Sequence, residues 1–228
     1  MHTRPITGRV GANALWDDDE IRGSGMARLS LEQRREAAIA ATLRVIAADG
    51  VEAATTRRIA TEANMGQSSI FYAFASRDEL LAAVVEHGVA QELDSMNEWL
   101  ETLADVPVGD TPIEDLVRAG LLAFAENAIT DPARQQVLIG LALYARRTPG
   151  LEYLAERLYD GYYDVAARVL DESARICGRS WSQPTAELAP TAIALSDGIT
   201  LCWLGTGSRD RVNAVVESAV TLFLGYLE

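Results

Sequence analysis

The sequence contains no lysine, and it has only two histidines and two cysteines among its 228 residues. Without lysine the chain can hold neither a P-loop nor a Schiff base. His2 lies close to the N-terminus and His87 in a helical pattern with no clustered ligands, so we expect no catalytic residue, metal or cofactor. Cys177 and Cys202 form no CxxC pair and are expected to be free thiols. These absences argue against an enzyme.

Long apolar runs are also missing, because Arg, Asp, Glu or Asn interrupts each one before the roughly eighteen residues that a membrane span needs. Hydrophobic residues make up 49% of the chain, which is enough for a buried core. Residues 1–27 mix Gly, Pro and an acidic run without the pattern of a signal peptide. We therefore expect a disordered leader over 1–27, and a soluble, cytoplasmic protein without a membrane partner.

Negative charge is unevenly distributed along this chain, whose net charge is −13. Residues 26–79 hold seven arginines and seven acidic residues, whereas residues 80–228 hold ten arginines and twenty-two acidic residues. Such a contrast indicates two modules with different electrostatic tasks. Because the acidic part repels phosphate, any nucleic-acid contact is expected in the N-terminal part.

The apolar residues recur with helical spacing almost everywhere, which predicts an all-α protein. Helix starts are marked by capping patterns at Ser30, Ser76, Thr111 and Ser208, and by several prolines that follow a cap. These signals predict nine helices, near residues 30–48, 56–63, 67–74, 77–103, 112–129, 132–147, 150–177, 185–204 and 209–227.

Residues 57–74 read as a short helix, a tight turn and a second short helix, which is the pattern of a helix-turn-helix. Asn64 tolerates a positive φ and can form the turn. Six apolar residues have the spacing to lock the two helices on a shared core: Ile59, Ala60, Ala63, Met65, Ile70 and Phe74.

Polar side chains remain for the outer face of the second short helix. Gln67 and Ser68 lie at its N-terminal end, where a recognition helix meets base edges, and Gln can pair with adenine. Arginines, hydroxyls and free helix amides would hold phosphates. The predicted DNA contacts are Thr56, Arg57, Arg58, Gln67, Ser68, Ser69, Tyr72 and Arg77. The alternative is a three-helix structural subdomain with an ordinary polar surface.

Residues 31–80 resemble the N-terminal domain of the TetR family of bacterial transcriptional regulators. The resemblance is carried by Asp49-Gly50-Val51, Thr55-Thr56-Arg57, Ile59-Ala60, Phe71-Tyr72 and the run Ser76-Arg77-Asp78-Glu79-Leu80. It implies a two-domain architecture, with a DNA-binding domain over 28–78 and a domain for effector binding and dimerisation over 79–228. It also implies a homodimer that binds palindromic double-stranded DNA, most often as a repressor, and is released by a small-molecule effector. Phe71 and Ala73 stand where the family usually has polar side chains, which shifts phosphate contacts towards Tyr72 and the arginines.

The resemblance also implies a paired surface on the last two helices and a ligand cavity among the middle ones. Broad apolar faces predict a dimer interface at Leu195, Ile199, Val212, Val216, Val220 and Phe223. The predicted pocket residues are Trp99, Phe124, Asn127, Leu141, Tyr144, Tyr162 and Trp203. In both cases the alternative is that these side chains pack on the core of their own chain.

A second function stays open beside the ligand-responsive repressor. The same helix-turn-helix dimer could organise the nucleoid or bind proteins without a small ligand. A palindrome in the protein's own promoter would favour the local regulator, whereas many dispersed sites would favour the organiser.

Overall fold

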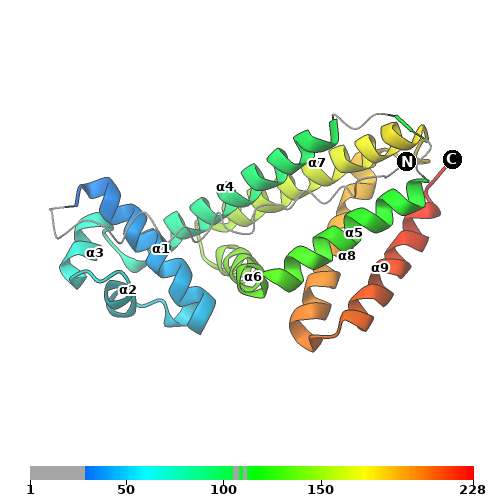
Figure 1. Ribbon diagram of the computed structural model, residues 1–228. Helices are drawn as coiled ribbons and strands as arrows, with labels where there is room; N and C mark the ends of the chain where they lie inside the picture. The colour runs from blue at the N-terminus through cyan, green and yellow to red at the C-terminus, as the bar shows by residue number, and fades with distance from the viewer. Residues whose placement is uncertain (1–28, 105–107, 110–111) are drawn as a thin grey trace. The chain divides into compact units, whose positions relative to one another are not determined.

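The computed structural model describes residues 29–104, 108–109 and 112–228 (Figure 1). Within these ranges the chain forms nine α-helices, one short 3₁₀ helix and no named strand, so the fold is all-α as predicted. The elements are α1 (Leu31–Asp49), η1 (Val51–Ala53), α2 (Thr56–Glu62), α3 (Gln67–Ala73), α4 (Arg77–Ala104), α5 (Ile113–Thr130), α6 (Pro132–Arg147), α7 (Glu152–Cys177), α8 (Thr185–Thr206) and α9 (Arg209–Leu224).

Side-chain caps explain where several helices begin. The Ser30 Oγ accepts from the Gln33 amide over 3.1 Å, and the Ser30 amide donates to Gln33 Oε1 over 2.9 Å, which confirms the predicted capping box. The Ser76 Oγ accepts from the Glu79 amide over 3.0 Å, but the Glu79 carboxylate accepts from the amide of Ala75, one residue before the predicted partner. Both pairings satisfy amides that a helix start leaves open.

The other two predicted caps differ from each other. Ser208 Oγ accepts from the Arg211 amide over 3.4 Å, so Ser208 caps α9 as predicted. The predicted cap Thr111 lies outside the described residues, and α5 begins after Pro112, whose side chain makes no cap bond.

The chain divides into two compact units. Of the described residues, 29–92 and 133–158 form the N-terminal unit, and 93–132 and 159–228 form the C-terminal unit. The limits fall inside α4, after the first residue of α6, and inside α7. The predicted functional boundary between residues 78 and 79 lies within the N-terminal unit, so it stays a prediction about function and does not mark a change of compact unit.

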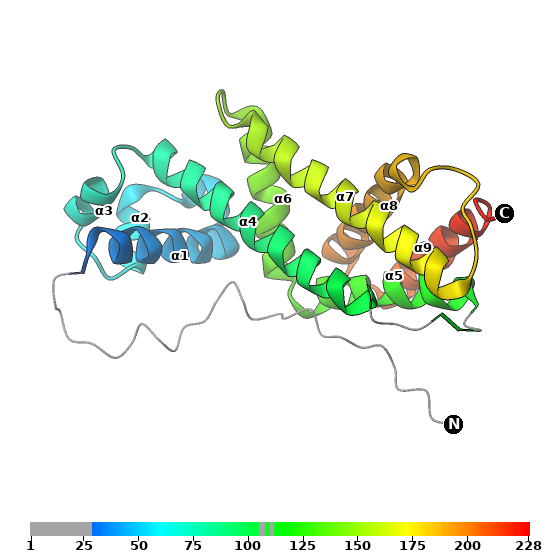
Figure 2. The same ribbon diagram turned by 90° about the horizontal axis from the view of Figure 1, so that it is seen from above.

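In the N-terminal unit, helices α1, α2 and α3 pack together around a small apolar core (Figure 2). Ile59, Ile70 and Phe74 are at most 1% exposed, which confirms the predicted centre of this core. Ala63 and Met65, also predicted to be core residues, are only partly buried. Asn64 adopts φ 51° in the turn between α2 and α3, where few residues other than Gly and Asn fit.

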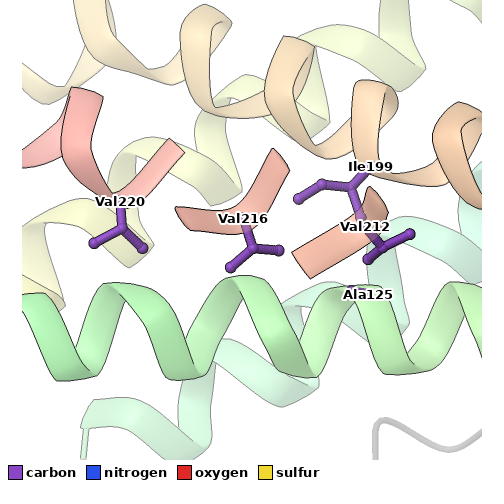
Figure 3. Close-up of a cluster of buried hydrophobic side chains, with 5 residues drawn as sticks. All are labelled: Ala125, Ile199, Val212, Val216 and Val220. Carbon is purple, nitrogen blue, oxygen red and sulfur yellow. The ribbon is translucent and has the colours of Figure 1, made fainter. Parts of the chain in front are cut away.

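In the C-terminal unit, helices α5, α8 and α9 enclose a second core. Figure 3 shows Val212, Val216 and Val220 of α9 directed towards α5, together with Ile199 of α8 and Ala125 of α5. Partly buried residues including Phe124 and Trp203 pack around this cluster.

Two ion pairs connect α5 to α9. The Arg118 guanidinium contacts Glu217 over 2.9 Å, and Arg209 contacts Glu126 over 2.7 Å. The first pair lies towards the start of α5 and the end of α9, and the second pair at the opposite ends, so the two helices run antiparallel.

This arrangement corrects the predicted dimer face. Ile199, Val212, Val216, Val220 and Phe223 are at most 2% exposed inside a single chain, where they contact α5, α7 and α8. The sixth residue, Leu195, is partly buried against Leu188 and Phe223. The five buried side chains belong to the chain's own core, which was the alternative that the sequence left open. The place of Leu195 in a dimer interface stays a prediction.

Helix α8 is the one helix, within the part of the chain that the structure describes, that is long and apolar enough to span a membrane by length and composition. The sequence analysis expected none because it considered only uninterrupted apolar runs. Only 22% of the most apolar window of α8 is buried within the chain. Ile199 and Leu188 face inward, whereas Pro190, Ala194 and Leu201 are exposed. Helix α8 therefore presents apolar side chains on two faces.

Candidate functional site

The surface that is predicted to contact DNA bases, called the reading surface below, lies at the start of α3. Gly66 is the N-cap residue and offers no side-chain cap, and Gln67 and Ser68 follow it with exposed side chains, whereas Ser69 is half-buried. Gln67 Nε2 donates a hydrogen bond to Thr56 Oγ1 over 3.0 Å. Two predicted DNA contacts, one on each short helix, are therefore held together in one polar patch.

Aromatic side chains extend this surface along α3. Tyr72 is 68% exposed and Phe71 is 51% exposed, so neither ring belongs to the core of the unit. The guanidinium of Arg34, on α1, lies 5.2 Å from the centre of the Tyr72 ring. Sequence reasoning missed Arg34 because a one-dimensional pattern does not show which face of α1 lies beside α3.

Arg35, the neighbour of Arg34, has a structural role. It donates to the Ala73 carbonyl over 2.6 Å, and its guanidinium lies 4.1 Å from the centre of the Phe74 ring. It therefore fixes the end of α3 against α1.

Arg58 takes part in an ion-pair network inside the N-terminal unit. It contacts Glu62 over 3.0 Å and Asp49 over 3.3 Å, while Arg44 contacts Glu62 over 3.0 Å. Hydrogen bonds from Arg44 and then Arg58 lower the pKa of Glu62, and the bond to Glu62 is the main reason why the pKa of Arg58 is raised. A phosphate contact by Arg58 would have to compete with two carboxylates.

Arg77 also has an internal role. Its Nε donates to the carbonyl of Ala54 over 2.8 Å, and one of its terminal nitrogens donates to the carbonyl of Val51 over 3.0 Å. These bonds join the start of α4 to η1 and to the residue that follows η1. In the structure Arg77 thus holds the start of α4 in place. The predicted phosphate contact would require at least one of its two hydrogen bonds to break.

Two cations remain on the reading surface without a carboxylate partner among the described residues, Arg57 on α2 and Arg34 on α1. Arg57 is exposed and takes part in no ion pair within the described ranges. Arg35, Arg44, Arg58 and Arg77 all contact carboxylates or carbonyls. The positive charge available to phosphate is therefore smaller than the arginine count indicates.

The predicted pocket residues fall into both compact units. Leu141 and Tyr144 belong to the N-terminal unit, and Phe124, Asn127, Tyr162 and Trp203 to the C-terminal unit. Phe124 and Trp203 pack against the α5–α9 core, and Leu141 is buried beside Gly88. The side chain of Trp99 lies outside the described part of the chain. The pocket therefore stays a prediction.

A surface hollow of about 500 Å³ lies at the connection between α7 and α8, and none of the predicted pocket residues lines it. Its walls include Arg175, Arg179 and Trp181. Cys177 and Cys202 are free thiols, as predicted. In the described ranges, no three His, Cys, Asp or Glu side chains gather closely enough to hold a metal ion.

Comparison with known proteins agrees with this geometry. Residues 38–84, which run from α1 into α4, match the family model described as bacterial regulatory proteins, tetR family. The N-terminal part of the chain therefore carries the domain of the TetR family of transcriptional regulators. The chain is 26% identical over 197 residues to the HTH-type nicotine-responsive transcriptional repressor HdnoR of Paenarthrobacter nicotinovorans, with 86% of this chain and 97% of that protein covered.

Solved structures share the fold of this chain. A putative transcriptional regulator from Saccharomonospora viridis, in complex with choline, is 21% identical with a TM-score of 0.65, covering 86% of this chain and 99% of that one. The multidrug binding protein EbrR, complexed with imidazole, is 24% identical with a TM-score of 0.61, covering 83% and 94%. The expected pairing of a helix-turn-helix unit with a helical remainder is confirmed by these likenesses.

Proposed function

We propose that this TetR-family regulator is a homodimeric repressor that binds a palindromic operator and is released by a small-molecule effector. The observation that carries the proposal is the polar patch of exposed Gln67 and Ser68 and partly exposed Thr56, on helices fixed by Ile59, Ile70 and Phe74. Support comes from the curated relative, whose name is that of a nicotine-responsive transcriptional repressor. A cytoplasmic location and the absence of catalysis belong to the same proposal.

Helix α3 would enter the major groove and read bases through Gln67 and Ser68. Tyr72, Arg57 and Arg34 lie beside these side chains and would contact the phosphates. Ser69 is kept as a predicted DNA contact but would contribute less to binding, because this residue is half-buried. Two such helices in a dimer would meet successive major grooves, roughly 34–36 Å apart.

The dimer surface is best placed on the outer faces of α8 and α9. Leu201 is 56% exposed and Leu222 is 42% exposed, although both are large apolar side chains. A Cβ added at Gly198 or Gly205 would meet nothing within 4 Å, so no described part of this chain covers these positions. An apolar helix with an uncovered second face is expected to pack against another helix. The outer stripe comprises Pro190, Ala194, Gly198, Leu201, Gly205, Ala214, Ser218 and Leu222.

An effector signal could reach the DNA-binding helices through α6. A Cβ added at Gly140 of α6 would lie 3.7 Å from Val51 Cγ2, just before α2. On the same helix, Leu141 Cδ1 lies 3.4 Å from the Cβ position of Gly88 on α4. Helix α6 thus contacts both the segment before the reading surface and the helix that follows it. The effector must prefer a conformer in which the two DNA-binding domains of the dimer are wrongly spaced for the operator. A ligand with equal affinity for both conformers would not shift the equilibrium between them.

The DNA-binding part can be tested with fragments from the gene's own upstream region. Purified protein should retard a palindromic fragment, and the double variant Gln67→Ala, Tyr72→Ala should abolish this while its circular dichroism is unchanged. Unchanged retardation would overturn the assignment of α3 as the recognition helix. Selection from a genomic fragment library would separate a local regulator, with a few palindromic sites, from a dispersed nucleoid organiser.

The dimer can be tested by light scattering on matched variants. Leu201→Glu on α8 should yield a folded monomer, whereas Leu143→Glu on α6, where the wild-type side chain is also 56% exposed, should leave the dimer intact. Val216→Glu should instead unfold the C-terminal unit, because Val216 is fully buried within the chain. A Leu201→Glu protein that remains dimeric would exclude the outer stripe as the interface.

A further inference from the structure

Asp197 is a half-buried carboxylate on α8, the apolar helix described above. It lies in the stretch between Ile193 and Ile199, both of which are buried. Its Oδ2 accepts a hydrogen bond from the hydroxyl of Tyr159, on α7, over 3.1 Å. An acidic side chain in such a helix needs compensation, because an ionised carboxylate loses most of its solvation on burial.

The tyrosine that bonds to this carboxylate is one of three whose rings lie together on α7. The Tyr159 and Tyr162 rings are 5.6 Å apart at 72°, and the Tyr159 and Tyr163 rings are 6.1 Å apart at 54°. All three pack beside Ala166, Ala189 and Ile193, and all three remain partly exposed. A small molecule could therefore reach both the rings and the carboxylate.

No described residue balances the charge at this position. Burial raises the pKa of Asp197, and burial together with Asp197 raises the pKa of Tyr159 to about 12, so Tyr159 remains a neutral donor at physiological pH. No arginine among the described residues forms an ion pair with Asp197. Within the described part of the chain the carboxylate therefore has a hydrogen bond but no counter-ion, and an unpaired buried charge is costly.

We propose that Asp197, together with Tyr159, Tyr162 and Tyr163, binds the positively charged nitrogen of a small organic cation, either a protonated amine or a quaternary ammonium. The carboxylate would supply the counter-charge, and the electron-rich ring faces would attract the groups attached to the nitrogen. The inference rests on the proposed function, since it names the chemical class of the effector.

The donor set favours an organic cation over a metal ion. A divalent cation takes six or more oxygen ligands, or a tetrahedral set of nitrogen and sulfur ligands. This position offers one half-buried carboxylate and the neutral phenols of the tyrosines. Aromatic rings around a single negative charge suit a large, weakly hydrated cation.

The test is calorimetric titration of the full-length dimer with two probes of equal shape, choline chloride and 3,3-dimethylbutan-1-ol. We expect saturable binding of choline, and binding of the neutral alcohol that is weaker by about tenfold or more. Asp197→Asn should weaken choline binding by about tenfold and leave the alcohol unaffected. Equal binding of the two probes, or no saturable choline binding, would overturn the proposal.

A matched variant separates local recognition from net charge. Glu187→Gln removes one negative charge from the exposed first turn of α8 and should leave choline binding unchanged. The double variant Tyr162→Leu, Tyr163→Leu should weaken choline binding while Asp197 stays in place. If Glu187→Gln weakens choline as much as Asp197→Asn does, the attraction is long-range and the site is wrong.

A parallel DNA-retardation assay distinguishes this inference from the proposed function. Choline binding that requires Asp197 but does not change DNA binding would keep the cation site and remove its role as the effector site. DNA binding by a protein that shows no saturable choline binding would remove the cation site and leave the regulator. Loss of DNA binding altogether would count against the proposed function alone.

Discussion

Gln67 donates a hydrogen bond from Nε2 to Thr56 Oγ1 over 3.0 Å, which joins the first residue of α3 to the first residue of α2. The bond fixes the rotamer of a side chain that is otherwise exposed. One amide hydrogen and the carbonyl oxygen of Gln67 are not used by this bond, and these are the groups that pair with adenine N7 and N6. Thr56 is therefore a positioning residue for Gln67 in the proposed complex.

This pair yields the first prediction. Gln67→Ala should weaken binding to the operator by about 1–3 kcal/mol and relax preference at one base pair in each half-site. Thr56→Val keeps the shape but removes the hydroxyl, so it should weaken specific binding less while leaving non-specific binding unchanged. Fluorescence anisotropy with the operator and with single-base variants measures both. Equal losses on all sequences for Gln67→Ala would show that Gln67 contacts the backbone and not a base.

The second prediction concerns adjacent arginines with different partners. Arg57 is exposed and in no ion pair within the described residues, so Arg57→Ala should weaken binding to every DNA sequence. It should also reduce the number of counter-ions released on binding by about one per subunit. Arg58 is bound to Glu62 and Asp49, so Arg58→Ala should mainly lower the melting temperature of the N-terminal unit. Anisotropy over a series of salt concentrations, together with thermal melts, separates the two effects. A large salt effect from Arg58→Ala with no change in melting would contradict the assignment.

With Arg57 and Arg34 as the main phosphate contacts, a dimer would neutralise roughly four phosphates, and the logarithm of its affinity would fall with the logarithm of salt concentration with a slope of about −4. A much steeper slope would show that Arg58 or Arg77 gives up its internal partners on DNA.

The third prediction is the pH dependence that Glu62 confers. Its pKa in the folded chain is lowered from the ordinary value of 4.5, first by the hydrogen bond from Arg44 and then by that from Arg58. The folded state thus binds fewer protons than the unfolded state, so this stabilisation is fully present above pH 4.5 and is lost as the pH falls through the lower folded value. Glu62→Gln should destabilise the N-terminal unit at pH 7, and the difference from wild type should shrink below pH 4.5.

Urea unfolding followed by circular dichroism at pH 7 and pH 3.5 measures this difference. Glu52→Gln is the matched control, because Glu52 is an exposed acid in η1 that takes part in no ion pair among the described residues. It should not affect stability at either pH. A Glu62→Gln effect of the same size at both pH values would show that charge plays no part in it.

Sequence reasoning succeeded where structure depends on neighbours along the chain. The capping box at Ser30, the positive φ of Asn64 and the burial of Ile59 and Ile70 all follow from spacing within one or two helical turns. The same holds for the limits of the helices, which agree with the predicted limits to within three residues.

The roles that depend on tertiary contacts could not be predicted in this way. Arg77 looks like a phosphate contact in the sequence, but it bonds to the carbonyls of Ala54 and Val51, which lie more than twenty residues earlier. Helix α8 is apolar on two faces, so its periodicity does not reveal that Ile199 faces the core and Leu201 faces outward. The significance of Asp197 depends on Tyr159 of another helix.

The last prediction contrasts two glycines that lie inside helices. A Cβ at Gly120, on α5, would meet nothing within 4 Å, whereas a Cβ at Gly161, on α7, would overlap Leu93 Cδ2 and lie 2.7 Å from Leu93 Cδ1. Gly120→Ala should therefore stabilise the chain by about 0.5–1 kcal/mol through helix propensity. Gly161→Ala gains the same propensity but must displace Leu93, so we expect a net loss of about 1 kcal/mol.

A double-mutant cycle with Leu93→Val identifies the cause of the loss at Gly161. Because valine has neither Cδ atom of leucine, the double variant should recover most of the stability lost in Gly161→Ala. The cycle should show a coupling free energy of about 0.5–3 kcal/mol. Leu93 lies on α4, the helix that begins directly after the reading surface, and Gly161 lies between Tyr159 and Tyr162 on α7. If displacement of Leu93 also changes operator affinity, this contact is a route from the tyrosines to the DNA-binding helices, whereas a change in stability alone would limit Gly161 to packing.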